Sequence, residues 1–547
     1  MNRARMHRGG ASLRRGAIVP AVCALLFGLL VAIAAGCGRA KGPGGAGASG
    51  DGSSGDGGAD TFRILAGSEL RDVAPAVQAA AARAHVNVAF SYAGTLDIVE
   101  RINDGEHFDA ILPPNGAYPV LALVRKPLAR EKLFYSRVAL GVKAAKAAEL
   151  GWDGNPPTWA EIAAAARAGR FRYAMTNPTS SNTGMSALFA VASAAAKKTE
   201  DLAVQDVDPH VITDFLSGQK LTAGSSGWLA DAYLKDPSVV DGIVNYEAVI
   251  LRLNDKLPQS ERLKLVYPRD GVISADYPLM LLESGRRDEY NRLVAVLKGI
   301  EFQRTALAPA YLRPSNPDAG LAPALPSGAV AELTFPNRLE VIDAVLTSYQ
   351  SNWRRPSTSI FVLDVSGSMA GDRLDGVRKA LKVLAGADTS SATARYARFQ
   401  NRERVMLITF SNDVSEPTAV DIAAGGIAQA HARIRDFADA LEAKNGTAIY
   451  SALRAANDLA LREAAADTGR FVSIVLLTDG ESNTGISFGD YASAVSAAPQ
   501  HVRVFPILFG ESSVDQMQAV ADLTGGRVFD ARTTSLATVF KEIRGYQ

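Results

Sequence analysis

A short hydroxyl-rich segment near the middle of the chain has the side chains needed to bind a metal ion. Ile360 to Leu363 are all apolar, which predicts a strand buried on both faces, and this run ends at Asp364. Asp364, Ser366 and Ser368 then occupy alternate positions around Gly367. One carboxylate and two hydroxyl oxygens around a common point suit a hard divalent cation, which prefers oxygen ligands.

Two later segments can complete such a site. Asn445-Gly446-Thr447 separates two helical patterns, and the apolar run Phe471 to Leu477 predicts a second buried strand that leads into Thr478 and Asp479. Strand C-termini lie along one edge of an open α/β sheet, so we expect Thr447 and Asp479 near Asp364.

Residues 357–547 resemble a von Willebrand factor A-like domain, which has a doubly wound, Rossmann-like α/β fold. The five positions of that family's metal-ion-dependent adhesion site correspond here to Asp364, Ser366, Ser368, Thr447 and Asp479. The resemblance implies bound Mg²⁺, or alternatively Mn²⁺ or Ca²⁺. It also implies an open coordination position that receives an Asp or Glu carboxylate from a protein partner.

Two other interpretations of the segment remain. Ser and Asp side chains commonly cap helices, so the segment could be a serine-rich helix cap. An aspartyl-phosphate hydrolase also places a nucleophilic Asp after its first strand, but it requires a second Asp where this chain has Ser366. Metalloprotease and phosphate-loop motifs are absent from the sequence, so we predict a protein without catalytic activity.

The composition predicts a globular protein of several domains. The chain has 547 residues, of which 47% are hydrophobic, enough for several cores. The formal net charge of +1 gives no reason to expect a nucleic-acid partner through bulk electrostatics. Both cysteines lie within the first 37 residues, so no disulfide is expected in the folded part.

The N-terminal segment predicts export and membrane anchoring. Two arginines precede the apolar run Ala17 to Ala35, which is followed by Gly36 and Cys37. This ending resembles a bacterial lipobox, which implies a signal peptide over residues 1–37, lipidation of Cys37 and attachment to a bacterial cell membrane. An uncleaved transmembrane helix is the alternative. Residues 38–60 are rich in Gly and Ser and predict a flexible tether.

Residues 61–313 alternate predicted strands and helices, which indicates mostly parallel α/β sheets. They resemble a two-lobe, periplasmic-type extracellular solute-binding protein of type II. The resemblance implies one lobe of residues 61–137 and 272–313, a second lobe of residues 138–271, and a hinge at the extended segments 133–142 and 263–267. Polar side chains cluster at predicted helix N-termini, where backbone N–H groups bind polar ligands. The resemblance implies the following solute ligands: Ser68, Thr95, Ser180, Ser181, Thr183, Ser225, Ser226 and Tyr246.

Residues 314–356 contain a proline-rich linker and then a helix, residues 339–353, whose apolar stripe predicts docking on a neighbouring domain. The leading hypothesis is a membrane-anchored extracytoplasmic binding protein. It would recognise a protein through the ion site and a small polar solute in the N-terminal cleft. The alternative is the solute-binding component of a membrane permease, with the C-terminal domain as its docking module.

Overall fold

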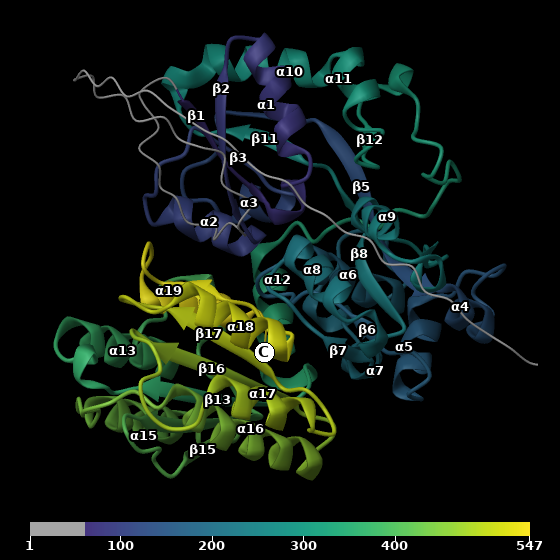
Figure 1. The fold of residues 1–547 in the computed structure, drawn as a ribbon. Helices are drawn as coiled ribbons and strands as arrows, with labels where there is room; N and C mark the ends of the chain where they lie inside the picture. The colour runs from purple at the N-terminus through teal and green to yellow at the C-terminus, as the bar shows by residue number, and fades with distance from the viewer. Residues whose placement is uncertain (1–60, 547) are drawn as a thin grey trace, which may run out of the picture. The chain divides into compact units, whose positions relative to one another are not determined.

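The computed structural model describes residues 61–546, whose strands form three sheets (Figure 1). The predicted signal peptide, Cys37 and the tether lie outside the described residues, so the lipid anchor stays a prediction. Within residues 61–546, none of the helices has the length and apolar character needed to cross a membrane.

The first sheet has the strand order β2-β1-β3-β11-β4. Its first three strands run parallel, whereas β11 pairs antiparallel with both β3 and β4. The strands are β1 Thr61–Gly67, β2 Asn87–Ala93, β3 Ala110–Leu112, β4 Ala129–Lys132 and β11 Pro278–Leu281. The helices of this lobe are α1 Ala74–Arg83, α2 Thr95–Asn103, α3 Ala117–Ala122, α10 Arg287–Lys298 and α11 Ile300–Thr305.

The second sheet follows the order β10-β5-β8-β6-β7, with β9 and β12 also paired to β5. Its strands are β5 Phe134–Lys143, β6 Tyr173–Ala174, β7 Gln219–Leu221, β8 Gly242–Tyr246, β9 Leu263–Val266, β10 Ser274–Ala275 and β12 Arg313–Pro314. The helices are α4 Ala144–Leu150, α5 Trp159–Arg167, α6 Asn182–Ala195, α7 Pro209–Ser217, α8 Ser226–Lys235 and α9 Glu247–Lys256. The two sheets give residues 61–313 the predicted two-lobe α/β architecture.

The connection between the lobes centres on β5. The two extended segments predicted as the hinge coincide with β5 and β9, which pair antiparallel from Leu140 to Lys143. The chain returns through β10, which pairs with β5 at Ser136 and Arg137. A third crossing, β12, pairs with the start of β5 and was not predicted, because a two-residue strand leaves no periodic pattern.

The third sheet lies in the C-terminal domain, in the order β15-β14-β13-β16-β17-β18. Its strands are β13 Ser357–Asp364, β14 Glu403–Phe410, β15 Thr418–Ile422, β16 Phe471–Thr478, β17 Arg503–Leu508 and β18 Phe529–Asp530. All pairs are parallel except β14 with the edge strand β15, which the sequence patterns did not predict.

Helices cover both faces of this sheet, as the prediction of a doubly wound domain requires (Figure 1). They are α13 Asp372–Lys382, α14 Ala392–Ala397, α15 Ile427–Asp439, α16 Ile449–Ala466, α17 Phe488–Ser496, α18 Val514–Thr524 and α19 Leu536–Arg544. Ile360 and Val362 enter one apolar core, whereas Phe361 and Leu363 enter the other. This confirms that β13 is buried on both faces.

A helix precedes this domain. It consists of α12, Leu339–Ser348, followed by one π-helical turn, Tyr349–Trp353. Its apolar side chains at Val341, Ile342, Val345 and Leu346 are buried. The helix packs against α3 of the first lobe and against residues 204–206 of the second lobe.

Candidate functional site

The loop after β13 holds Asp364 in a fixed orientation. The carboxylate is fully buried. Its Oδ1 accepts a hydrogen bond from the Ser366 backbone N–H at 2.7 Å, and its Oδ2 accepts one from the Thr478 hydroxyl at 2.6 Å. Since Thr478 ends the neighbouring strand β16, the pairing of β13 with β16 aligns the two residues.

Asp479 and the two loop serines join the same cluster. The Ser368 hydroxyl donates to Asp479 Oδ1 at 2.8 Å, and the hydroxyl oxygens of Ser366 and Ser368 lie 3.1 Å apart. Four of the five residues predicted from the sequence are therefore linked by direct hydrogen bonds or through the neighbouring Thr478.

Thr447 lies on the adjacent loop. Lys444 N–H on that loop donates to the Val365 carbonyl at 2.6 Å, next to the serines. Thr447 itself is buried, and its backbone N–H donates to Asn483 Oδ1 at 3.0 Å. The loop of Thr447 therefore borders the loop of Asp364, although the structure shows no direct bond between the Thr447 hydroxyl and the other four residues.

The cluster concentrates negative charge in a buried place. Burial raises the pKa of Asp364; hydrogen bonds from Thr478 and Ser366 oppose this rise, and the nearby Asp479 carboxylate adds to it. Asp479 also forms an ion pair with Arg373 of α13. A cation between the two carboxylates would offset their mutual repulsion.

The donor set fits a hard cation. In the stretch from residue 61 to residue 546, no group of three or more His, Cys, Asp and Glu could hold a metal. The cluster instead offers three hydroxyl groups and two carboxylates, which suit Mg²⁺ or Mn²⁺ better than Zn²⁺. Asp364, Ser366, Ser368, Thr447 and Asp479 are the residues that would hold such an ion.

The predicted solute residues meet between the lobes. Ser68, which follows β1, donates to the Ser225 hydroxyl at 2.7 Å and accepts from the Gly227 backbone N–H at 3.2 Å. Ser226 Oγ contacts the hydroxyls of Thr183 and Ser181. Ser68 belongs to the first lobe and the others to the second, so the two hydrogen bonds of Ser68 close the cleft at this point.

Thr95 and Ser180 meet at a second point of the cleft. A Cβ on Gly94, the residue before Thr95, would lie 2.3 Å from the Ser180 carbonyl oxygen. The Ser180 hydroxyl donates to the carbonyls of Asn177 and Gly224. The Thr95 hydroxyl is buried and has no hydrogen-bond partner in the structure, so it is free to bond a ligand.

Tyr246 lies beside polar residues that the sequence patterns did not identify. Its hydroxyl accepts a hydrogen bond from Asn182 Nδ2 at 2.9 Å, and its ring centroid lies 5.9 Å from that of Tyr277. Glu69 is also buried, which raises its pKa to about 7. Glu69 Oε1 and Asn182 Oδ1 have no hydrogen-bond partner. The sequence analysis identified cleft residues only from clusters of hydroxyl side chains. Glu69 is a single carboxylate within a predicted helix, so it was not identified.

Comparisons with known proteins agree with this architecture. Residues 62–307 match the family model of the bacterial extracellular solute-binding protein, and residues 360–542 match that of the von Willebrand factor type A domain. The chain therefore joins an extracellular solute-binding domain to a von Willebrand factor A (VWA) domain. This combination makes it an extracytoplasmic binding protein.

One curated relative is the inter-alpha-trypsin inhibitor heavy chain H4 of Sus scrofa, which is 32% identical over 133 residues. These residues are 24% of this chain, which spans only 13% of the relative. Among solved structures, the periplasmic binding protein AfuA from Actinobacillus pleuropneumoniae is 12% identical with a TM-score of 0.41, over 53% of this chain and 97% of that one. A ferric binding protein from Campylobacter jejuni is 13% identical with a TM-score of 0.39, over 52% and 95% of the two chains.

Proposed function

We propose that the VWA domain captures a protein partner through a divalent ion. The hydrogen-bonded cluster of Asp364, Ser366, Ser368 and Asp479 carries this proposal. Two carboxylates balance the +2 charge of a bound Mg²⁺ and the neutral hydroxyls add none, so an open coordination position would still attract an Asp or Glu side chain of the partner. Arg373, paired with Asp479, would add to this attraction for an acidic group.

Calorimetry with MgCl₂ tests the ion site in the purified chain. Asp364→Asn, which keeps the shape of the side chain, should abolish the binding heat. Asp375→Asn is the matched control, because Asp375 is an exposed carboxylate on α13. Excess Mg²⁺ should also stabilise the folded chain, by about 2.7 kcal/mol at a hundred times Kd. Equal binding heat in the parent and Asp364→Asn would reject the ion site.

A synthetic peptide pair tests the acidic partner. A peptide with a central Glu should bind the Mg²⁺-loaded chain, whereas the same peptide with Gln should not. Binding that persists equally in EDTA would show that the carboxylate is not held by the ion.

We further propose that the cleft binds a small polar solute. The cluster of buried hydroxyls contributed by both lobes supports the solute site, because such groups satisfy a polar ligand when they are not bonded to one another. A thermal-shift panel of sugars, amino acids and oxyanions tests the site, with Thr95→Val and Ser226→Ala as variants that should lose the stabilisation. We also propose that Cys37 anchors the chain to the membrane. Intact-mass analysis of the native protein tests the anchor, since retention of residues 1–36 would disprove it.

A further inference from the structure

The last helix of the VWA domain contacts both lobes of the solute-binding domain. On the first lobe, Lys541 of α19 donates to Glu100 of α2 at 2.9 Å. The two side chains are only 20% and 12% exposed, so this ion pair is largely shielded from water. Shielding makes such a pair stronger than an exposed pair of the same geometry.

On the second lobe, the chain around α19 contacts the solute loops themselves. Asn177, which lies three residues before Ser180, donates from its Nδ2 to the Arg544 carbonyl at 3.4 Å. The Tyr546 ring stacks on that of Trp228 with centroids 6.5 Å apart, and Arg527 lies 3.6 Å above the same Trp228 ring. Trp228 lies in α8, two residues after the candidate ligand Ser226.

The junction of α19 with the two lobes is tightly filled. The cavity left there has a volume of about 20 Å³, room for a single water molecule, and Asp97, Ser180, Gly224, Lys541 and Gly545 are among the residues that line it. Asp97 belongs to the first lobe, Ser180 and Gly224 belong to the second lobe, and Lys541 and Gly545 lie in α19 or directly after it. The end of the VWA domain therefore covers one edge of the solute cleft.

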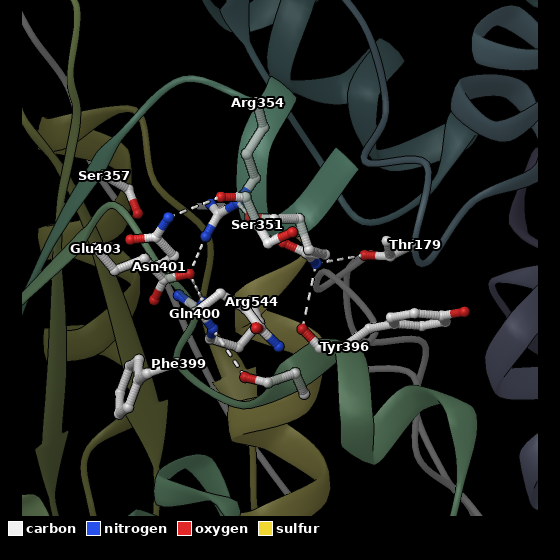
Figure 2. A network of polar contacts seen from close by, with 12 residues as sticks. Thr179, Ser351, Arg354, Ser357, Tyr396, Phe399, Gln400, Asn401, Glu403 and Arg544 are labelled. Atoms are coloured by element: carbon white, nitrogen blue, oxygen red, sulfur yellow. Dashed lines mark hydrogen bonds and ion pairs between the residues drawn. The ribbon is translucent and has the colours of Figure 1, made fainter. Parts of the chain in front are cut away.

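The helix is also firmly held in its own domain. Phe540 and Ile543 are buried in the core, and the Arg544 guanidinium donates to the buried Glu403 of β14. Figure 2 shows Arg544 and Arg354 converging on Glu403, with Thr179 of the second lobe nearby, where it accepts a hydrogen bond from Gln350. Rotation of one lobe away from the other must therefore break contacts with the VWA domain rather than carry α19 along.

We propose that the VWA domain, through α19, latches the two lobes in their closed arrangement, so that the solute cleft opens only when α19 releases one lobe. This inference rests on the proposed solute site and adds its regulation. Anything that displaces the VWA domain from the lobes would then promote entry or release of the solute.

The distance between spin labels on the two lobes tests the latch without any solute. Asp104→Cys in the first lobe and Ala145→Cys in the second are both exposed, and Cys23→Ser with Cys37→Ser makes the labelling specific. Lys541→Glu should increase the fraction of long distances about fivefold or more by placing two carboxylates together. The exchanged pair Glu100→Lys with Lys541→Glu should restore the short distance.

The control is Arg454→Glu, the same reversal of charge on an exposed face of α16. A distance distribution that does not change in Lys541→Glu, or one that the exchanged pair fails to restore, would overturn the latch. If Lys541→Glu does not fold, the neutral variant Lys541→Gln decides in the same way, with a smaller expected change. Because no solute is added, failure of the latch is measured separately from failure of the solute site.

Discussion

The Arg544 guanidinium donates to the Glu403 carboxylate at 2.5 Å, and both side chains are at most 5% exposed. Arg354 donates to the same oxygen. Burial lowers the pKa of each arginine to about 9. Both arginines still carry their charge at neutral pH, and the Glu403 carboxylate that they share lies against both of them.

Glu403→Gln should destabilise the protein strongly. It removes the negative charge that the buried guanidinium groups of Arg354 and Arg544 share, and removing one partner of a buried pair costs about 3–5 kcal/mol. Denaturant unfolding measures the loss, and the exposed Glu416→Gln serves as the control. A loss no larger than that of the control would show that the two arginines find compensation elsewhere.

Thr478→Val should weaken the proposed ion site while preserving its ligands. The Thr478 hydroxyl donates to Asp364 Oδ2, and valine has nearly the same shape but no donor. Loss of a group that orients a metal ligand typically reduces affinity by about 10- to 100-fold. Titration with Mg²⁺ measures the change. The control is Thr468→Val, an exposed threonine beyond the opposite end of β16; equal Mg²⁺ affinity in the two variants would refute the role of the hydroxyl.

Gly510→Ala should also disturb the ion site, through Asp479. A Cβ on Gly510 would lie 2.9 Å from the Asp479 Cβ. Gly525→Ala is the matched control, because both glycines have positive φ, +55° and +71°, but no atom lies within 4 Å of a Cβ on Gly525. Both variants should lose about 1 kcal/mol of stability from backbone strain, and only Gly510→Ala should also lose Mg²⁺ affinity. Equal Mg²⁺ affinity in both would contradict the role of this close contact.

The fold and the ion cluster were predictable because local patterns determine them. Apolar runs such as Ile360 to Leu363 identify buried strands, and the parallel order then brings Asp364 and Asp479 to one edge of the sheet. The polar loops around Ser68 and Ser225 likewise follow from strand and helix ends. These inferences need only the position of each residue relative to its own element.

Contacts between elements far apart in sequence were not predictable. The amphipathic pattern of α19 gives the face that Phe540 and Ile543 bury, but not that Lys541 on another face meets Glu100. Glu69 was missed for a similar reason, since its burial depends on packing between the lobes.

Asp97 should make stability depend on pH. Burial raises its pKa from 3.8 to about 7, the carboxylates of Glu100 and Glu542 add to the rise, and Arg101 and Lys541 oppose it. The charged form is disfavoured in the folded state, so the stability contributed by the neutral form is complete below about pH 4 and is lost as pH rises to about 7.

Asp97→Asn should therefore reduce the fall in unfolding free energy between pH 5 and pH 8. Part of the fall should persist, because the pKa of Glu69 is also raised to about 7 and shifts stability in the same direction. Urea unfolding at several pH values measures the slope. An unchanged slope in Asp97→Asn would show that Asp97 does not titrate in this range.

Gly94→Ala should force the lobes apart at one of the points where they are in contact. The φ of Gly94 is −69°, which alanine adopts without strain, but its Cβ would lie 2.3 Å from the Ser180 carbonyl oxygen of the other lobe. Relief of this clash should cost about 1–3 kcal/mol, either as lost stability or as a shift towards an open cleft. The control is Gly285→Ala, where a Cβ meets no atom within 4 Å. Thermal unfolding and small-angle scattering together measure both outcomes. If Gly94→Ala matches the control in both measurements, the close approach of the lobes at Ser180 does not exist in solution.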